Sequence, residues 1–131
     1  MLLKNYAPLI LLASIVIFVG CGSGSPVRNY QNTPIKASAE KKNQKNIRRA
    51  IIIGATNLGW QIREMNQGLI IATIYSGGKM AKVDINYTTE SFNIIYRDSS
   101  NFQYDGANIH PLYNKWVKRL HKRIRKNLTQ M

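Results

Sequence analysis

The sequence predicts an α+β domain of two layers: a helix, a four-stranded antiparallel meander and a second helix, in that order. Three observations indicate this class. A segment with helical spacing of apolar residues comes first, four short β-rich runs follow, and a long amphipathic segment ends the chain. Each of these elements has one apolar face to bury, so we expect both helices to pack on one face of the sheet.

The first helix is expected in the segment NIRRAIIIGATNLGW, residues 46–60. One apolar face recurs there at helical spacing, formed by Ile47, Ala50, Ile51, Gly54 and Leu58. The β-branched residues 51–53 would also suit a buried strand. The basic residues before this run, and Gly59 just after it as a stop signal, favour the helix.

Between Trp60 and Asp98 the period of the apolar residues changes to two, which is typical of half-buried strands. Four runs, WQIREM, GLIIATIYS, KMAKVDINY and SFNIIYRD, are separated by short turns that predict hairpins. The alternation assigns to the inner face Ile70, Ala72, Ile74, Ala81, Val83, Ile85, Tyr87, Phe92, Ile94 and Tyr96. The opposite face is expected to be wet, with Lys82, Asp84, Asn86, Asn93 and Arg97.

The last helix is predicted in the segment IHPLYNKWVKRLHKRIRKNL, residues 109–128. Its apolar stripe is formed by Ile109, Leu112, Tyr113, Trp116, Val117, Leu120, Ile124 and Leu128. Pro111 suits the first turn, which places His110 near the N-cap. No acidic residue follows Asp105, and the rest of the helix surface carries Lys115, Lys118, Arg119, Lys122, Arg123, Arg125 and Lys126.

The first twenty residues have the pattern of a secretory signal. Lys4 lies in a short polar start, and residues 9–19 form a run of eleven residues that is apolar apart from Ser14. A helix of that length is too short to cross about 30 Å of hydrocarbon. We therefore expect export, with residues 1–20 as a signal peptide.

The single cysteine, Cys21, follows this signal directly. An exported chain with one cysteine cannot form an internal disulfide, so the thiol is free, pairs between chains or is modified. The sequence FVGC that ends at Cys21 resembles the lipobox of bacterial lipoproteins, in which the cysteine is lipidated. The resemblance implies a lipid anchor at Cys21, and Gly22 after it implies the outer membrane and its periplasmic face. The alternative is an ordinary secretory signal, cut nearby, with a free thiol.

The segment after Cys21 is polar, punctuated by Gly, Ser and Pro, and nearly free of large apolar residues. Such a composition does not bury enough surface to order itself. We predict a lipidated flexible tether over residues 21–42 and a single α+β domain over residues 43–131.

Parts of this domain resemble a group of small, uncharacterised lipoproteins of Gram-negative bacteria. The resemblance lies in the motifs GW at residues 59–60, AKVDINY at 81–87, IYRDS at 95–99 and IHPLYNKW at 109–116. That group brings no known activity, so the resemblance implies a location and a fold and leaves the function open.

The charge is lopsided, with 19 Lys and Arg against 6 Asp and Glu, which indicates an anionic partner. Solvation alone does not require a helix face of one sign. We therefore predict a non-enzymatic binding or structural module that contacts anionic lipid, lipopolysaccharide, peptidoglycan or an acidic envelope protein through its basic helix. Export argues against a nucleic-acid partner, although an exported nucleic-acid-binding module is one alternative.

Residue types that can serve as a nucleophile, a base or an orienting group lie in one segment, namely Asp98, Ser99, Ser100, Asp105 and His110. A small envelope hydrolase with His110 as its base and Asp98 or Ser99 nearby is the enzymatic alternative. The G-x-S-x-G turn is absent, and turn and cap roles explain these residues more simply.

The sequence predicts neither a metal site nor a cofactor. Its two histidines, His110 and His121, are eleven residues apart, and neither an H-x-x-x-H nor a C-x-x-C pair exists. A Walker-type phosphate loop is also absent.

Overall fold

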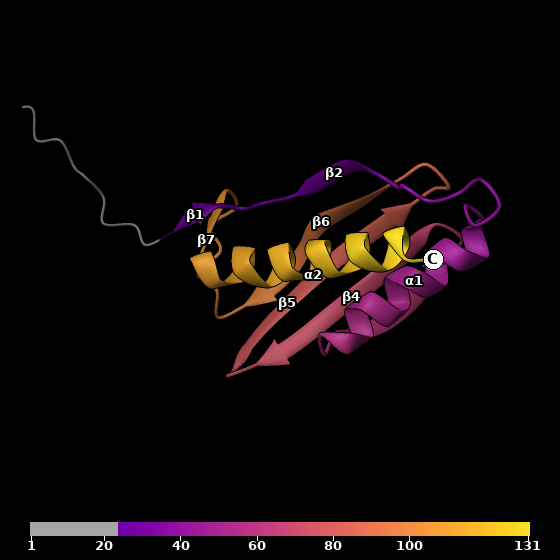
Figure 1. Ribbon diagram of the computed structural model, residues 1–131. Helices are drawn as coiled ribbons and strands as arrows, with labels where there is room; N and C mark the ends of the chain where they lie inside the picture. Colours follow the sequence, from indigo (N-terminus) through magenta and orange to yellow (C-terminus); the bar gives the residue numbers. More distant parts are fainter. Residues whose placement is uncertain (1–23) are drawn as a thin grey trace, which may run out of the picture.

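A computed structural model describes residues 24–131 of the chain (Figure 1). The predicted signal peptide and the predicted lipidation site, Cys21, lie outside the described residues. The elements follow in the order β1 Ser25–Pro26, β2 Tyr30–Pro34, α1 Gln44–Asn57, β3 Gln61–Asn66, β4 Leu69–Ser76, β5 Lys79–Tyr87, β6 Ser91–Ser100, β7 Asn108–Ile109 and α2 Pro111–Thr129.

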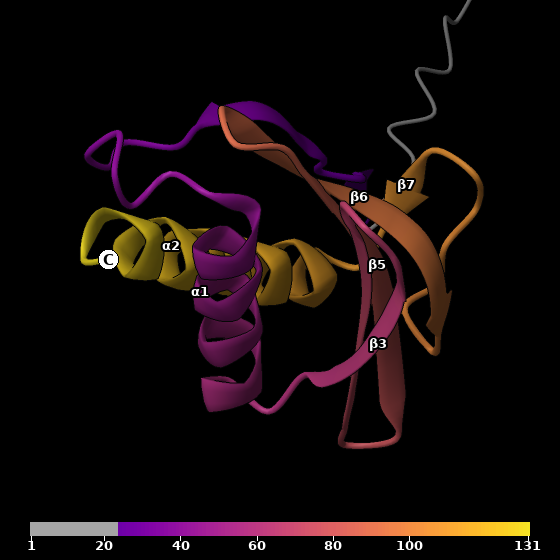
Figure 2. The ribbon, with the colours of Figure 1, turned by 90° about the vertical axis from the view of Figure 1, so that its right-hand side faces the viewer.

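The domain has two layers, as the sequence predicted. The main sheet has the order β2-β6-β5-β4-β3 with every pair antiparallel, and α1 and α2 lie together on one of its faces (Figure 2). The other face of the sheet is open. The helix–meander–helix prediction is confirmed, with one strand more than the four expected and a small β1–β7 sheet beside it.

The register of the meander explains which side chains form the core. Ile70 pairs with Ile85 and Ala72 with Val83, so the apolar residues of β4 and β5 share the inner face. These four side chains are buried, as the alternation predicted. On the open face Lys82, Asp84, Asn86 and Asn93 are half-buried and Arg97 is exposed.

The extra strand comes from the segment that was expected to be a tether. In β2, Tyr30 pairs with Ile94 and Thr33 with Phe92, so this strand forms one edge of the main sheet. Ile35 just after it is only 3% exposed. The prediction of a flexible tether over residues 21–42 is therefore wrong for residues 25–35. These residues have few apolar side chains to bury, but hydrogen bonds to the backbone of an existing sheet hold them in place.

The segment that begins at Gln44 is a helix and not a strand, as its spacing predicted. Asn43 caps it by accepting a hydrogen bond from the Asn46 N–H at 2.9 Å. Helix α1 lies close against α2 at Gly54, where an added Cβ would lie 3.3 Å from the Asn127 side chain and 3.4 Å from Ile124. The glycine thus permits the contact between the two helices.

Candidate anion-binding surface

The N-cap of helix α2 and its stripe of buried side chains show which side of the helix faces the core. His110 is the N-cap, and its Nδ1 accepts a hydrogen bond from the Leu112 N–H at 3.0 Å, with Pro111 in the first turn. Five side chains of the predicted stripe are fully or almost fully buried, namely Tyr113, Val117, Leu120, Ile124 and Leu128. With this face against the sheet and α1, the opposite face of the cylinder is directed to solvent.

The seven predicted cations lie on the rest of that cylinder. Six of them are exposed and Arg123 is half-buried; the exposed ones are Lys115, Lys118, Arg119, Lys122, Arg125 and Lys126. We call these seven residues the basic face of α2. Because they all lie between residues 115 and 126 on one side of a single rigid helix, they form one continuous surface rather than scattered charges.

None of these cations is neutralised by an acidic side chain of residues 24–131. The ion pairs found there join Lys42 to Glu90 at 2.9 Å, Arg48 to Glu64 at 2.7 Å and Arg97 to Asp84 at 2.8 Å, none of them on α2. The last acidic residue, Asp105, accepts from the N–H groups of Asn108 and Ala107, and these bonds lower its pKa. The basic face therefore keeps its full charge.

His121 belongs to α2 but faces the sheet edge. Its Nε2 lies 2.9 Å from Thr33 Oγ1, and its ring stacks on Tyr30 with centroids 4.0 Å apart. Burial, together with the charges of Arg125 and Arg28, lowers the pKa of His121 to about 4. The imidazole is thus neutral at pH 7, and it fastens β2 to α2 rather than adding to the basic face.

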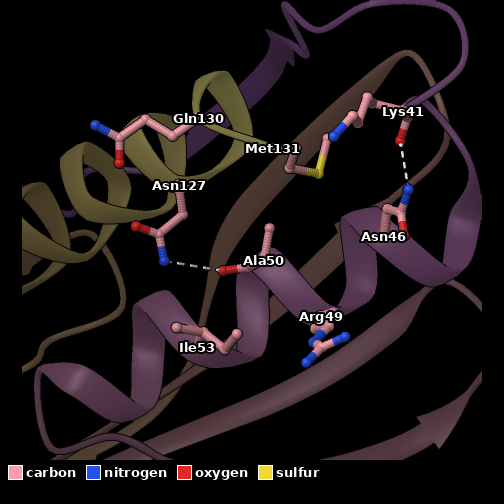
Figure 3. Close-up of a pocket in the computed structure, with 8 residues that line it drawn as sticks. All are labelled: Lys41, Asn46, Arg49, Ala50, Ile53, Asn127, Gln130 and Met131. Atoms are coloured by element: carbon pink, nitrogen blue, oxygen red, sulfur yellow. Dashed lines mark hydrogen bonds between the residues drawn. The ribbon is translucent and has the colours of Figure 1, made fainter.

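A hollow of about 390 Å³ continues the basic surface around the C-terminal end of α2 (Figure 3). Lys41 and Arg49 line it, and neither forms an ion pair with the residues that the structure describes. Two of its three amide side chains are used internally, because Asn127 donates to the Ala50 carbonyl at 3.3 Å and Asn46 to the Lys41 carbonyl at 3.2 Å. The hollow therefore offers positive charge and the N–H donors of these two cations.

The residues of the enzymatic alternative have local structural partners. Asp98 Oδ1 accepts from the Ser99 N–H at 2.8 Å, and Ser99 Oγ lies 2.9 Å from the Tyr96 hydroxyl. His110 caps α2, and within residues 24–131 no hydrogen bond joins it to Asp98, Ser99 or Ser100. Nor does any cluster of His, Cys, Asp and Glu suited to a metal occur in that range.

One cation of the charged surface, Arg28, is not among those predicted from the sequence. Arg28 lies in the expected tether, yet its guanidinium carbon sits 5.2 Å from the centre of the Tyr30 ring, beside the start of α2. In the sequence only its positive charge pointed to this surface, because its position depends on a contact with a residue more than eighty positions away.

Comparisons with protein-family models, curated proteins and solved structures find no match to this chain. No helix between residues 24 and 131 is long and apolar enough to span a bilayer. The surface just described is therefore the main structural guide to function.

Proposed function

We propose that this chain is a lipid-anchored, non-enzymatic binding module on the periplasmic face of the outer membrane. Cys21 carries the anchor, and the basic face of α2 contacts an anionic partner in the envelope. One observation carries the proposal: seven cations share one rigid face, and no acidic side chain of the described residues pairs with any of them.

The strength of such a contact follows from simple electrostatics. A Lys or Arg close to an anionic membrane surface contributes about 1 kcal/mol, and screening limits the attraction to roughly 8 Å at physiological salt. The contributions of several cations thus add up only if all of them contact the partner at the same time. Their position on one face of a rigid helix allows this. Holding them unpaired has no benefit for the fold, since like charges on one helix repel.

The anchor is tested by metabolic labelling with a fatty-acid analogue. Cys21 is the only cysteine of the chain, so the label on a Cys21→Ser variant is a direct control. We expect the wild-type chain to be labelled and to fractionate with the outer membrane, and the variant to lose the label. An unlabelled wild-type chain, or a variant that keeps its label, would overturn the anchor.

The binding role is tested by photo-crosslinking in intact cells. A photoreactive residue replaces Lys122 on the basic face, and in a matched control it replaces Lys82 on the open face of the sheet. We expect a discrete adduct from position 122 and much less from position 82. Equal yields from both positions would mean that the charge only solvates the domain.

A further inference from the structure

The N-terminal end of the described chain is held firmly against the start of α2. Strand β1 pairs antiparallel with β7, which directly precedes α2 (Figure 1). The Asn114 side chain accepts from the Arg28 N–H at 3.0 Å and donates to the Pro26 carbonyl at 2.9 Å. The amide of Asn114 thus pairs with the backbone of residues 26–28 as a neighbouring strand would, and it holds this segment against the start of α2.

A groove of about 390 Å³ lies at this entry point. It is lined by Pro26, Val27, Arg28, Asn114, Lys115 and Lys118. All three charged side chains are cationic and exposed, and they make no ion pair with any residue from 24 to 131. The groove therefore combines two apolar residues, Pro26 and Val27, with three cations from two separate segments.

The distance from this groove to the proposed anchor is short. Three residue steps separate Cys21 from Gly24, and a chain covers at most about 11 Å in three steps. Gly24 itself lies against β7, since a Cβ added to it would be 3.2 Å from the Asn108 Cβ. A lipid on Cys21 would thus hold the groove within about one or two screening lengths of the headgroups.

We propose that this groove docks on the anionic phospholipid headgroups of the membrane that carries the anchor. The inference rests on the proposed lipid anchor and adds the partner chemistry and the place of contact. Arg28 offers a planar fork that suits two phosphate oxygens, while Lys115 and Lys118 act as point charges beside it. A short linker keeps the local concentration of headgroups high, so a weak site is occupied.

This docking orients the domain on the membrane. Helix α2 begins at the groove and runs for 19 residues, or about 28 Å. The C-terminal half of the basic face, with Lys122, Arg125 and Lys126, then stands farther from the anchor than the groove does. Those cations remain free for a second envelope partner.

The test uses the full lipidated chain, purified and reconstituted into vesicles of phosphatidylethanolamine with or without phosphatidylglycerol. A photoreactive residue replaces Lys118 in one sample and Lys126 in another, and lipid adducts are measured by mass spectrometry. We expect adducts mainly from position 118 and only in vesicles that contain phosphatidylglycerol. The double variant Arg28→Gln, Lys115→Gln should lower that yield by roughly fivefold per cation, whereas Arg123→Gln, Arg125→Gln should not. Thermal unfolding of each variant checks that the fold is intact.

Each contrary outcome has a separate meaning. Equal lipid adducts at positions 118 and 126, or adducts that do not depend on phosphatidylglycerol, would overturn the groove but leave the basic face as a binding surface. The absence of lipid adducts at 118, together with a captured partner at position 122 in cells, would overturn only this inference. If neither experiment gives an adduct, the inference and the proposed function both fail.

Discussion

The outer face of α2 and the open face of the sheet both meet solvent, yet they handle charge differently. On the sheet face Arg97 Nη1 lies 2.8 Å from Asp84 Oδ1. Lys82 of β5 lies opposite Asp98 of β6 in the strand register. On α2 all seven charged side chains are positive, and none forms an ion pair within residues 24–131. Mixed charges are sufficient for solubility. The positive surplus is therefore concentrated on α2, where the fold does not require it.

The largest effect is expected on the buried side of the same helix. Leu120 is fully buried, so Leu120→Ala should destabilise the domain by about 2 to 5 kcal/mol. Lys118→Ala on the basic face should change the free energy of unfolding by less than about 0.5 kcal/mol. Denaturant unfolding of both variants measures the contrast. A similar loss from both would mean that the basic face is a structural element after all.

The second prediction concerns binding. Neutralising three cations with Lys118→Gln, Lys122→Gln and Arg125→Gln should weaken attraction to an anionic partner by about 3 kcal/mol, or roughly a hundredfold in affinity. The measurement is the in-cell crosslinking yield from a photoreactive residue at position 119. The matched control is the double variant Lys79→Gln, Lys82→Gln. Lys82 lies on the open face of the sheet, and Lys79 is the first residue of the same strand, β5. An unchanged yield from the triple variant would remove the distinction between the two faces.

The third prediction uses His121, through which α2 contacts the edge strand β2. Its pKa is about 4 in the fold against an ordinary value of 6.5, so the unfolded chain takes up the proton first as the pH falls. The free energy of unfolding should therefore decrease between pH 6.5 and pH 4. His121→Gln does not titrate, so the wild-type curve should fall more steeply than the variant's in this range. Parallel curves from urea unfolding would contradict the buried, neutral imidazole.

The smallest effect is expected on the sheet face. Arg97 and Asp84 form a partly exposed pair, so Arg97→Gln should cost less than about 1 kcal/mol of stability. It should also leave crosslinking from position 122 unchanged. A clear loss of crosslinking in this variant would show that the partner reads the sheet face as well.

Periodicity was enough to predict the elements that bury their own apolar residues. The stripe of α2 and the alternation of β4 to β6 follow directly from spacing, and the structure confirms them. Strand β2 was missed because it is an edge strand, whose order comes from the backbone of β6 and from the His121 ring. The groove at Arg28 was missed for a related reason, since its bond to Asn114 spans 86 positions. Local patterns do not contain such long-range pairings.

Lysine footprinting of the unmodified chain measures whether the basic face of α2 contacts an anionic partner. Isolated envelopes and detergent-solubilised protein are treated with an acetylating reagent, and each lysine is compared with itself. We predict that Lys115, Lys118, Lys122 and Lys126 become protected in envelopes, that high salt removes the protection, and that Lys82 reacts equally in both samples. Equal reactivity of the α2 lysines in envelopes and in detergent would contradict this contact.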